Sequence, residues 1–131
     1  GIEYNGDELL FIGGPVNSSA LVMLHTDDWA CTNTMPIVGT NLRISSDKTM
    51  IRRVCNGDRP NKWKMFLGMS AWSPHQLESE IAGAPPWSKK LAWLTSRHTE
   101  EIIFETDPTK SWRAAIDLSA SEMVESYFHI D

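Results

Sequence analysis

The stretch from residue 68 to residue 81, GMSAWSPHQLESEI, holds the clearest start of a helix in this chain. Ser73 is followed three residues later by Gln76, which is the spacing of a capping box. Pro74 stands at the first helical position, where its missing N–H costs nothing. The pattern therefore predicts a helix over residues 74–82.

Apolar side chains beside this helix start predict how the helix is anchored. Trp72 precedes the cap and Leu77 falls in the first turn, so the two are placed to form a hydrophobic staple. Leu77 and Ile81 share one face of the helix. We expect this segment to fix a helix against the neighbouring sheet rather than to transfer protons.

The polar residues of the same helix do not form an acid/base couple. Glu78 and Glu80 are two residues apart, so their side chains diverge by about 200° around the helix axis. His75 lies three residues before Glu78, and Gln76 lies four before Glu80, so each pair consists of surface neighbours. These spacings favour surface contacts, although a His–Glu pair could raise the pKa of the histidine.

Working outward from this helix, the chain alternates short strands and short helices, with a long loop over residues 26–40. Gly68 inside an apolar run suggests a bulge or a close approach of two backbones. Ser45 or Ser46 can cap one helix, which Asn56 and Gly57 end. We predict strands at 8–12, 20–25, 41–45, 64–72 and 102–105, and helices at 45–57, 74–82, from Pro108 after an Asp107 cap, and at 119–128.

The length and charge of the chain limit its class. It has 131 residues, of which 41% are hydrophobic and 22% charged, so one domain over 1–131 with its own core is expected. The formal net charge is −5, which argues against non-specific binding of nucleic acid. One local group of cations stands out as a solvated face or a small anion- or partner-binding patch: Arg52, Arg53, Arg59, Lys62 and Lys64.

Motifs for metal, cofactor or nucleophile chemistry are weak. Gly13, Gly14 and Pro15 begin GGPVN, which lacks the Lys-Ser/Thr of a phosphate loop and the third glycine of a dinucleotide fingerprint. His25 opens a metal-compatible His-Thr-Asp-Asp run, but no second cluster has ligand spacing. No serine sits in a G-x-S-x-G elbow. We expect no metal and no cofactor.

The cysteines and the apolar runs predict a cytoplasmic location. Cys31 and Cys55 form neither a metal spacing nor a redox spacing, so free thiols in a reducing compartment are expected. The longest apolar runs are too short to span a bilayer. No signal-peptide pattern is present.

The order of these landmarks resembles the YqgE/AlgH family of bacterial proteins. The most specific element is G-x-S-x-W-x-x-x-Q-L-E-x-E-I, from Gly68 to Ile81, and F-E-T-D-P-x-x-x-W, from Phe104 to Trp112, matches the closing strand and helix of that family. The resemblance spans about residues 9–116. It implies an α+β fold with a branched, mixed or antiparallel sheet, partly closed into a small barrel and flanked by helices. It implies an association with transcriptional control, and it supplies no catalytic residues.

Three departures from the family pattern carry expectations of their own. The chain begins almost at the GGPV landmark, so the N-terminal strands of the family are expected to be missing or shortened. Residues 83–93 form an insertion, and the tail from residue 119 looks unlike the usual ending. Without those strands a sheet edge or an apolar face would be open, so we expect self-association or cover by the C-terminal helix.

Two functions follow, and the first is preferred. The chain is expected to be a non-enzymatic binding or regulatory module with a protein partner, and nucleic acid is not expected as a direct partner. The alternative is a small hydrolase-like or ligand-binding enzyme with a pocket gathering His25, His75, Gln76 and Glu80. The predicted binding surface comprises Gly13, Gly14, Pro15, His25, Trp72, His75, Gln76, Glu78 and Glu80.

Overall fold

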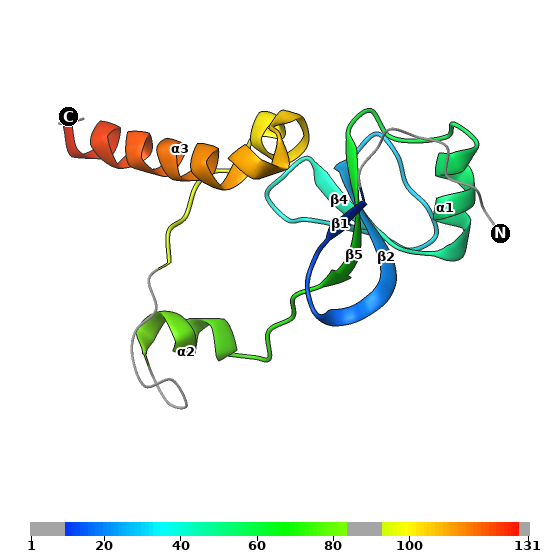
Figure 1. Cartoon of the computed structure of the whole chain (residues 1–131), viewed down its shortest axis with the longest axis horizontal. Helices are drawn as coiled ribbons and strands as arrows, with labels where there is room; N and C mark the ends of the chain where they lie inside the picture. Colours follow the sequence, from blue (N-terminus) through cyan, green and yellow to red (C-terminus); the bar gives the residue numbers. More distant parts are fainter. Residues whose placement is uncertain (1–9, 84–92, 129–131) are drawn as a thin grey trace. The chain divides into compact units, whose positions relative to one another are not determined.

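A computed structural model of the chain describes residues 10–83 and 93–128. They fall into two compact units, one up to Ala71 and the other from Trp72 onward (Figure 1). Each unit is described by itself, so one domain over 1–131 stays a prediction.

The first unit is built on a mixed five-stranded sheet with the order β1-β5-β2-β4-β3. β1 runs parallel to β5, and the other neighbouring pairs are antiparallel. The α+β class is confirmed, but the sheet does not branch and does not close into a barrel over the described residues. The strands are β1 (Leu10–Ile12), β2 (Val16–Thr26), β3 (Thr34–Pro36), β4 (Leu42–Ser45) and β5 (Trp63–Met69).

The core of this unit lies between the sheet and helix α1 (Lys48–Cys55) (Figure 1). Side chains alternate between the two faces of a strand, so Met23 on β2 and its cross-strand partner Met65 on β5 point to the same face. The core cluster on that side consists of Met23, Trp29, Met50, Val54 and Met65.

The two ends of α1 are set by short polar residues. Asp47, rather than the expected Ser45 or Ser46, is the N-cap, and its carboxylate accepts the Met50 N–H at 2.6 Å. Ser45 is unavailable because it belongs to β4 and its side chain is fully buried. Asn56 ends the helix as expected, and Gly57 follows with a φ of 88°.

The chain passes from β1 to β2 across the end of β5, because β5 lies between those two strands in the sheet. Gly13 and Gly14 make this crossing, and a Cβ on either would collide with the backbone of Gly68 or Met69. Gly68 has a φ of 73°, and its own added Cβ would meet the Gly14 carbonyl. The close backbone approach predicted at Gly68 is therefore confirmed, and Pro15 completes the connection.

The second unit is helical. It contains α2 (Gln76–Ala82), the π-helical turn η1 (Glu101–Glu105) and α3 (Pro108–Phe128). The cap predicted for α3 is confirmed, because the Asp107 carboxylate accepts the Thr109 N–H at 2.9 Å. The described residues of this unit include only one buried residue, Ser119.

Two predictions for this unit are wrong. Residues 102–105 form a helical turn rather than a strand, because the Thr99 hydroxyl accepts the Ile102 N–H at 3.1 Å and starts a turn. The expected separate helix at 119–128 is instead the second half of α3, since no Gly or Pro interrupts the chain after Pro108.

Other expectations differ in extent. β3 lies inside the predicted loop 26–40, and β5 ends three residues before the expected end of its strand. Most of the expected insertion at 83–93 lies outside the described residues, as do Glu8 and Leu9 of the first predicted strand. No helix within 10–83 or 93–128 is long and apolar enough to cross a membrane.

The crossing generates a stability prediction. Gly68→Ala should lower the free energy of unfolding by about 2–4 kcal/mol, because it adds a left-handed backbone penalty to a collision with the Gly14 carbonyl. Gly39→Ala is the matched control: Gly39 has a φ of 79°, but nothing lies within 4 Å of an added Cβ, so the loss should be about 1 kcal/mol. Urea unfolding measures both, and equal losses would contradict the steric account.

Candidate functional site

A buried polar network joins three strands of the first unit. His25 on β2 is fully buried, and its Nδ1 lies 2.6 Å from the Thr26 carbonyl oxygen. Its Nε2 lies 2.6 Å from the hydroxyl of Ser45 on β4. That hydroxyl lies 2.6 Å from the hydroxyl of Thr34 on β3. Both ring nitrogens are therefore engaged inside the sheet.

The environment of His25 favours a neutral ring. Burial is the largest influence and lowers the pKa of His25, while the bond to the Thr26 carbonyl and the charge of Asp28 raise it. The charge of Arg43 lowers it further. The rings of His25 and Trp29 pack at 88° to each other, with the two centroids 5.4 Å apart.

This Ser–His contact has the spacing of a nucleophile and its base but not the access. Ser45 is fully buried, and its hydroxyl already contacts both His25 and Thr34. A nucleophile must reach a reacting atom about 3 Å away, and no substrate can approach this oxygen without opening the sheet. The arrangement is suited to holding strands together.

The network extends to Cys31 in the loop between β2 and β3. The Cys31 N–H donates to the Thr34 hydroxyl at 2.8 Å, and the Thr34 hydroxyl lies 3.4 Å from the Cys31 sulfur. Hydrogen bonds from Thr49 and from the Cys31 thiol, in that order, hold the pKa of Asp47 well below its usual range. Cys31 and Cys55 are both free thiols, as expected.

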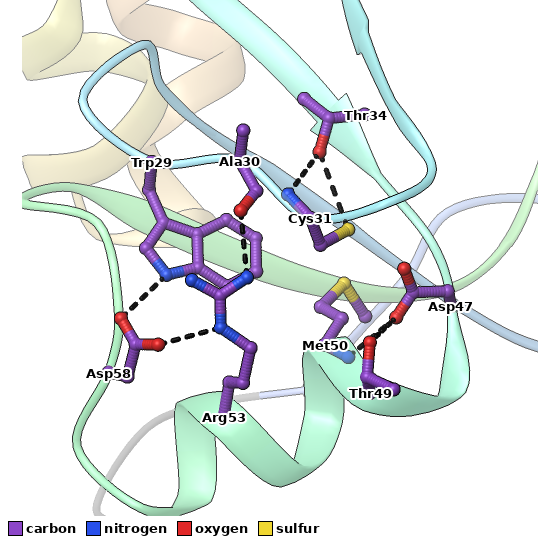
Figure 2. Close-up of polar contacts among 9 residues, drawn as sticks. All are labelled: Trp29, Ala30, Cys31, Thr34, Asp47, Thr49, Met50, Arg53 and Asp58. Carbon is purple, nitrogen blue, oxygen red and sulfur yellow. Dashed lines mark hydrogen bonds and ion pairs between the residues drawn. The ribbon is translucent and has the colours of Figure 1, made fainter.

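A second cluster ties the same loop to α1. Figure 2 shows Arg53 lying against the Trp29 ring, with its Cζ 4.3 Å from the ring centroid. Arg53 also donates to Asp58 at 2.6 Å and to the Ala30 carbonyl at 2.8 Å. The Trp29 indole N–H donates to Asp58 at 3.0 Å. Hydrogen bonds from Arg53 and Trp29 lower the pKa of Asp58.

The cations of the predicted anion-binding patch have different surroundings. Arg52 and Arg53 lie on α1, but only Arg52 is exposed to solvent. Lys64 on β5 lies over the Phe11 ring at 4.8 Å, and burial lowers its pKa. Arg59 lies 5.8 Å from the Trp63 centroid, and Lys62 is half-buried just before β5. An anion-binding role for this patch stays a prediction.

The start of α2 differs in detail from the predicted capping box. The helix begins at Gln76, and His75 occupies the cap position with a left-handed φ of 66° and no side-chain cap bond. Half of the box is present, because the Gln76 side-chain oxygen accepts the Ser73 N–H at 3.0 Å. Gln76 lies 3.4 Å from Glu80, while Glu78 is exposed.

These observations bear on the alternative enzymatic pocket without testing it. Among its proposed members, His25 has both ring nitrogens bonded within its own sheet. The Gln76 side chain accepts the Ser73 N–H, as a helix-starting residue does, and donates to the Glu80 carboxylate. Trp72 is exposed and meets Trp93 edge-on, with centroids 6.4 Å apart.

Sequence reasoning missed an apolar groove in the second unit. The segment 93–96 lies along α3 and forms a groove of about 500 Å³, which a second hollow of about 720 Å³ continues toward the end of the helix. Trp112 is 74% exposed there, and Leu94 and Met123 are each 64% exposed. The groove is lined by Trp93, Leu94, Thr95, Ser96, Trp112, Ala115, Ile116 and Ser119, and its continuation by Glu122, Met123 and Ser126.

One charged pair borders this groove. Glu122 Oε1 is shielded from solvent and lies 3.3 Å from Arg97 Nε, without the geometry of a hydrogen bond. Ala115, Ile116 and Ser119 lie between Trp112 and Met123 along α3 and line the groove. The sequence places Trp112, Met123 and Val124 on this helix but does not show that they are exposed, so it carried no clear signal of the groove.

No metal site was found within residues 10–83 and 93–128. No group of three or more His, Cys, Asp or Glu side chains there has the arrangement needed to hold a metal ion. The charges that act on the pKa of His25 are one acid and one base, Asp28 and Arg43.

The comparisons with known proteins agree with one another. The model of the family described as AlgH-like matches residues 2–123. A UPF0301 protein of Sphingopyxis alaskensis is 31% identical over 117 residues, which is 88% of this chain and 58% of the relative. A UPF0301 protein of Gluconobacter oxydans is 37% identical, over 80% of this chain and 52% of the relative.

A solved structure shares the fold. The solution structure of the AlgH protein from Pseudomonas aeruginosa matches 93% of this chain and 60% of its own, with a TM-score of 0.70 and 23% identity. The chain thus spans little more than half the length of the proteins that it matches.

The Trp29–Arg53 cluster generates the next prediction. Arg53→Ala should lower the free energy of unfolding by about 1–2 kcal/mol, because it removes the contact with the Trp29 ring and the bond to the Ala30 carbonyl. Arg52→Ala, one residue earlier on α1 and exposed, should change it by less than about 0.5 kcal/mol. Thermal unfolding followed by Trp fluorescence compares the two variants. The explanation fails if Arg52→Ala lowers the free energy of unfolding as much as Arg53→Ala does.

Proposed function

The chain belongs to the AlgH-like family, and we propose that it works as a non-enzymatic binding module whose partner is a protein. The observation that carries the proposal is the apolar groove along α3. Exposed apolar patches of this kind mark interaction sites in soluble domains. The free energy falls when a partner covers aromatic surface that was exposed to water.

The composition of the groove favours a protein segment over a small polar ligand. Two tryptophans, Trp93 and Trp112, line the groove, and tryptophan is enriched at the energetic centres of protein interfaces. Ala115 and Ile116 add apolar surface to the lining of the groove. An amphipathic segment with apolar residues at helical spacing fits such a site.

The chemistry of the buried polar groups also supports binding over catalysis. The hydroxyl and imidazole that come closest to a catalytic pair, Ser45 and His25, are fully buried and joined to neighbouring strands. The acidic net charge of −5 favours a protein partner over nucleic acid, since phosphate binding relies on a surplus of Lys and Arg.

The regulatory part of the proposal rests on the resemblance of the sequence motifs to the YqgE/AlgH family. A module that binds a protein partner can act in transcriptional control without touching DNA. The chain matches only a little more than half of the length of each of these relatives. Partner contacts of the full-length relatives therefore need not all lie on this chain. A cytoplasmic location, self-association and binding through the GGPVN turn and the α2 start remain predictions.

The proposal predicts which residues of the groove determine the affinity for a bound peptide. Peptides selected from a displayed library of amphipathic helices against the whole chain should bind with micromolar affinity, and Trp112→Ser or Met123→Glu should weaken them at least tenfold. Trp112→Ser removes an apolar anchor from the groove, and Met123→Glu places a charge in the groove. Fluorescence anisotropy with synthetic peptides measures the affinities.

The matched control is Ile12→Glu, which alters a side chain that is 88% exposed on β1, outside the groove. It should leave peptide affinity unchanged. If Ile12→Glu weakens the binding of the selected peptides and the groove variants leave it unchanged, the groove is not the binding site. If no amphipathic peptide is selected at all, the proposed class of partner is wrong.

A further inference from the structure

The groove along α3 has a single charged side chain among the described residues that line it. Glu122 lines the continuation of the groove, three residues after Ser119 and four before Ser126, so these three side chains share one face of the helix. The other lining residues of the two hollows are apolar, aromatic or carry a neutral hydroxyl. The charge that an occupant meets in this groove is therefore negative.

One oxygen of this acid lacks a hydrogen-bond donor among the described residues. Oε1 of Glu122 is shielded from solvent, yet it accepts no hydrogen bond. The Nε of its ion-pair partner Arg97 lies 3.3 Å away, outside hydrogen-bond geometry. A shielded carboxylate oxygen without a donor is unfavourable, because the group has lost water and gained no hydrogen bond in return. A donor on a bound partner would remove this penalty.

Arg97 is a weak competitor for that place. Its side chain is 71% exposed and that of Glu122 is 36% exposed, so water competes with both members of the pair. A Lys or Arg on a partner would be covered by the apolar residues that the partner places in the groove, and the lower local dielectric strengthens its attraction to the acid. Because Oε1 is already shielded, little further hydration is lost at that oxygen.

Charge is also unevenly distributed along α3. Both bases of this helix precede Ala114, whereas Asp117, Glu122 and Glu125 follow it. The helix dipole adds partial negative charge at the same end. The groove therefore runs from an apolar end at Trp112 to an acidic end at Glu122.

We propose that the occupant of the groove is a basic amphipathic segment, whose Lys or Arg pairs with Glu122 while its apolar residues cover Trp112 and Met123. This inference rests on the proposed function, since it names the charge of the protein segment that the groove binds. It also gives the segment a direction, with its cation at the acidic end of the groove. An acidic segment is disfavoured, because its carboxylate would face that of Glu122.

A displayed peptide library selected against the whole chain tests the charge of the occupant. Each peptide carries fixed leucines at helical spacing, and the remaining positions hold Lys, Glu, Gln or Ser in equal proportion. Lys should be enriched over Glu next to the last leucine at one end of the selected peptides. Two synthetic peptides that differ only by Lys→Gln at this position then give an affinity ratio by fluorescence anisotropy. We expect the Lys peptide to bind at least about fivefold more tightly.

Three variants of the protein identify the origin of this ratio. Glu122→Gln keeps the shape of the side chain and removes its charge, so the ratio should fall to about one. Arg97→Gln removes the competing cation, so the ratio should rise at least about twofold, which keeps the test decisive if Glu122→Gln does not fold. Glu125→Gln is the matched control, because Glu125 is exposed and is not among the described residues that line the hollows, and it should leave the ratio nearly unchanged.

The outcomes separate this inference from the proposed function. A preference for Glu or for neutral residues, or a ratio that Glu122→Gln leaves unchanged, overturns the inference. If Trp112→Ser still weakens the same peptides, the groove remains the binding site and the proposed function stands. If no peptide is selected, or if Trp112→Ser has no effect on the selected peptides, the proposed function fails and the inference fails with it.

Discussion

The sheet depends on a place where two backbones come too close for any side chain. Because β5 lies between β1 and β2, the three-residue connection between those strands must pass over the end of β5. Gly13 and Gly14 meet Gly68 there, and each fills a position that a Cβ would block. A longer connection could take a wider path, but Pro15 leads directly into β2. The parallel pairing of β1 with β5 exists only because this crossing is allowed.

The crossing places β2 in the middle of the sheet, and the rest of the unit follows from that position. One face of β2 carries Met23 into the core under α1, and the same face carries His25 into contact with β4. The loop after β2 is then tied down twice, by Arg53 over Trp29 and by the Thr34 hydroxyl under Cys31. The polar groups of this unit hold strands and loops in place, whereas the apolar groove belongs to the helical unit.

The sequence predicted local structure well where one short pattern was sufficient. Gly68, the Asp107 cap and the Asn56 stop each act through their own backbone, so they were found without knowledge of the fold. The strand expected at 102–105 was wrong because a run of only three apolar residues, Ile102 to Phe104, has no diagnostic period. The His25–Ser45–Thr34 network was invisible because it joins residues up to twenty apart through strand pairing. The groove was missed because exposure of an apolar side chain is a tertiary property.

The crossing also governs when the sheet can be completed during synthesis on the ribosome. The first two strands leave the exit tunnel long before β5, yet each pairs with β5 along an edge. Until Met69 has emerged, β1 has no neighbour among the described strands, and only the shorter pairing of β2 with β4 is available. Among the described strands, β1 would then be without a pairing partner in a nascent chain arrested before that point, and unpaired strand edges are prone to aggregation. Translation speed through residues 46–69 therefore sets how long that strand stays exposed.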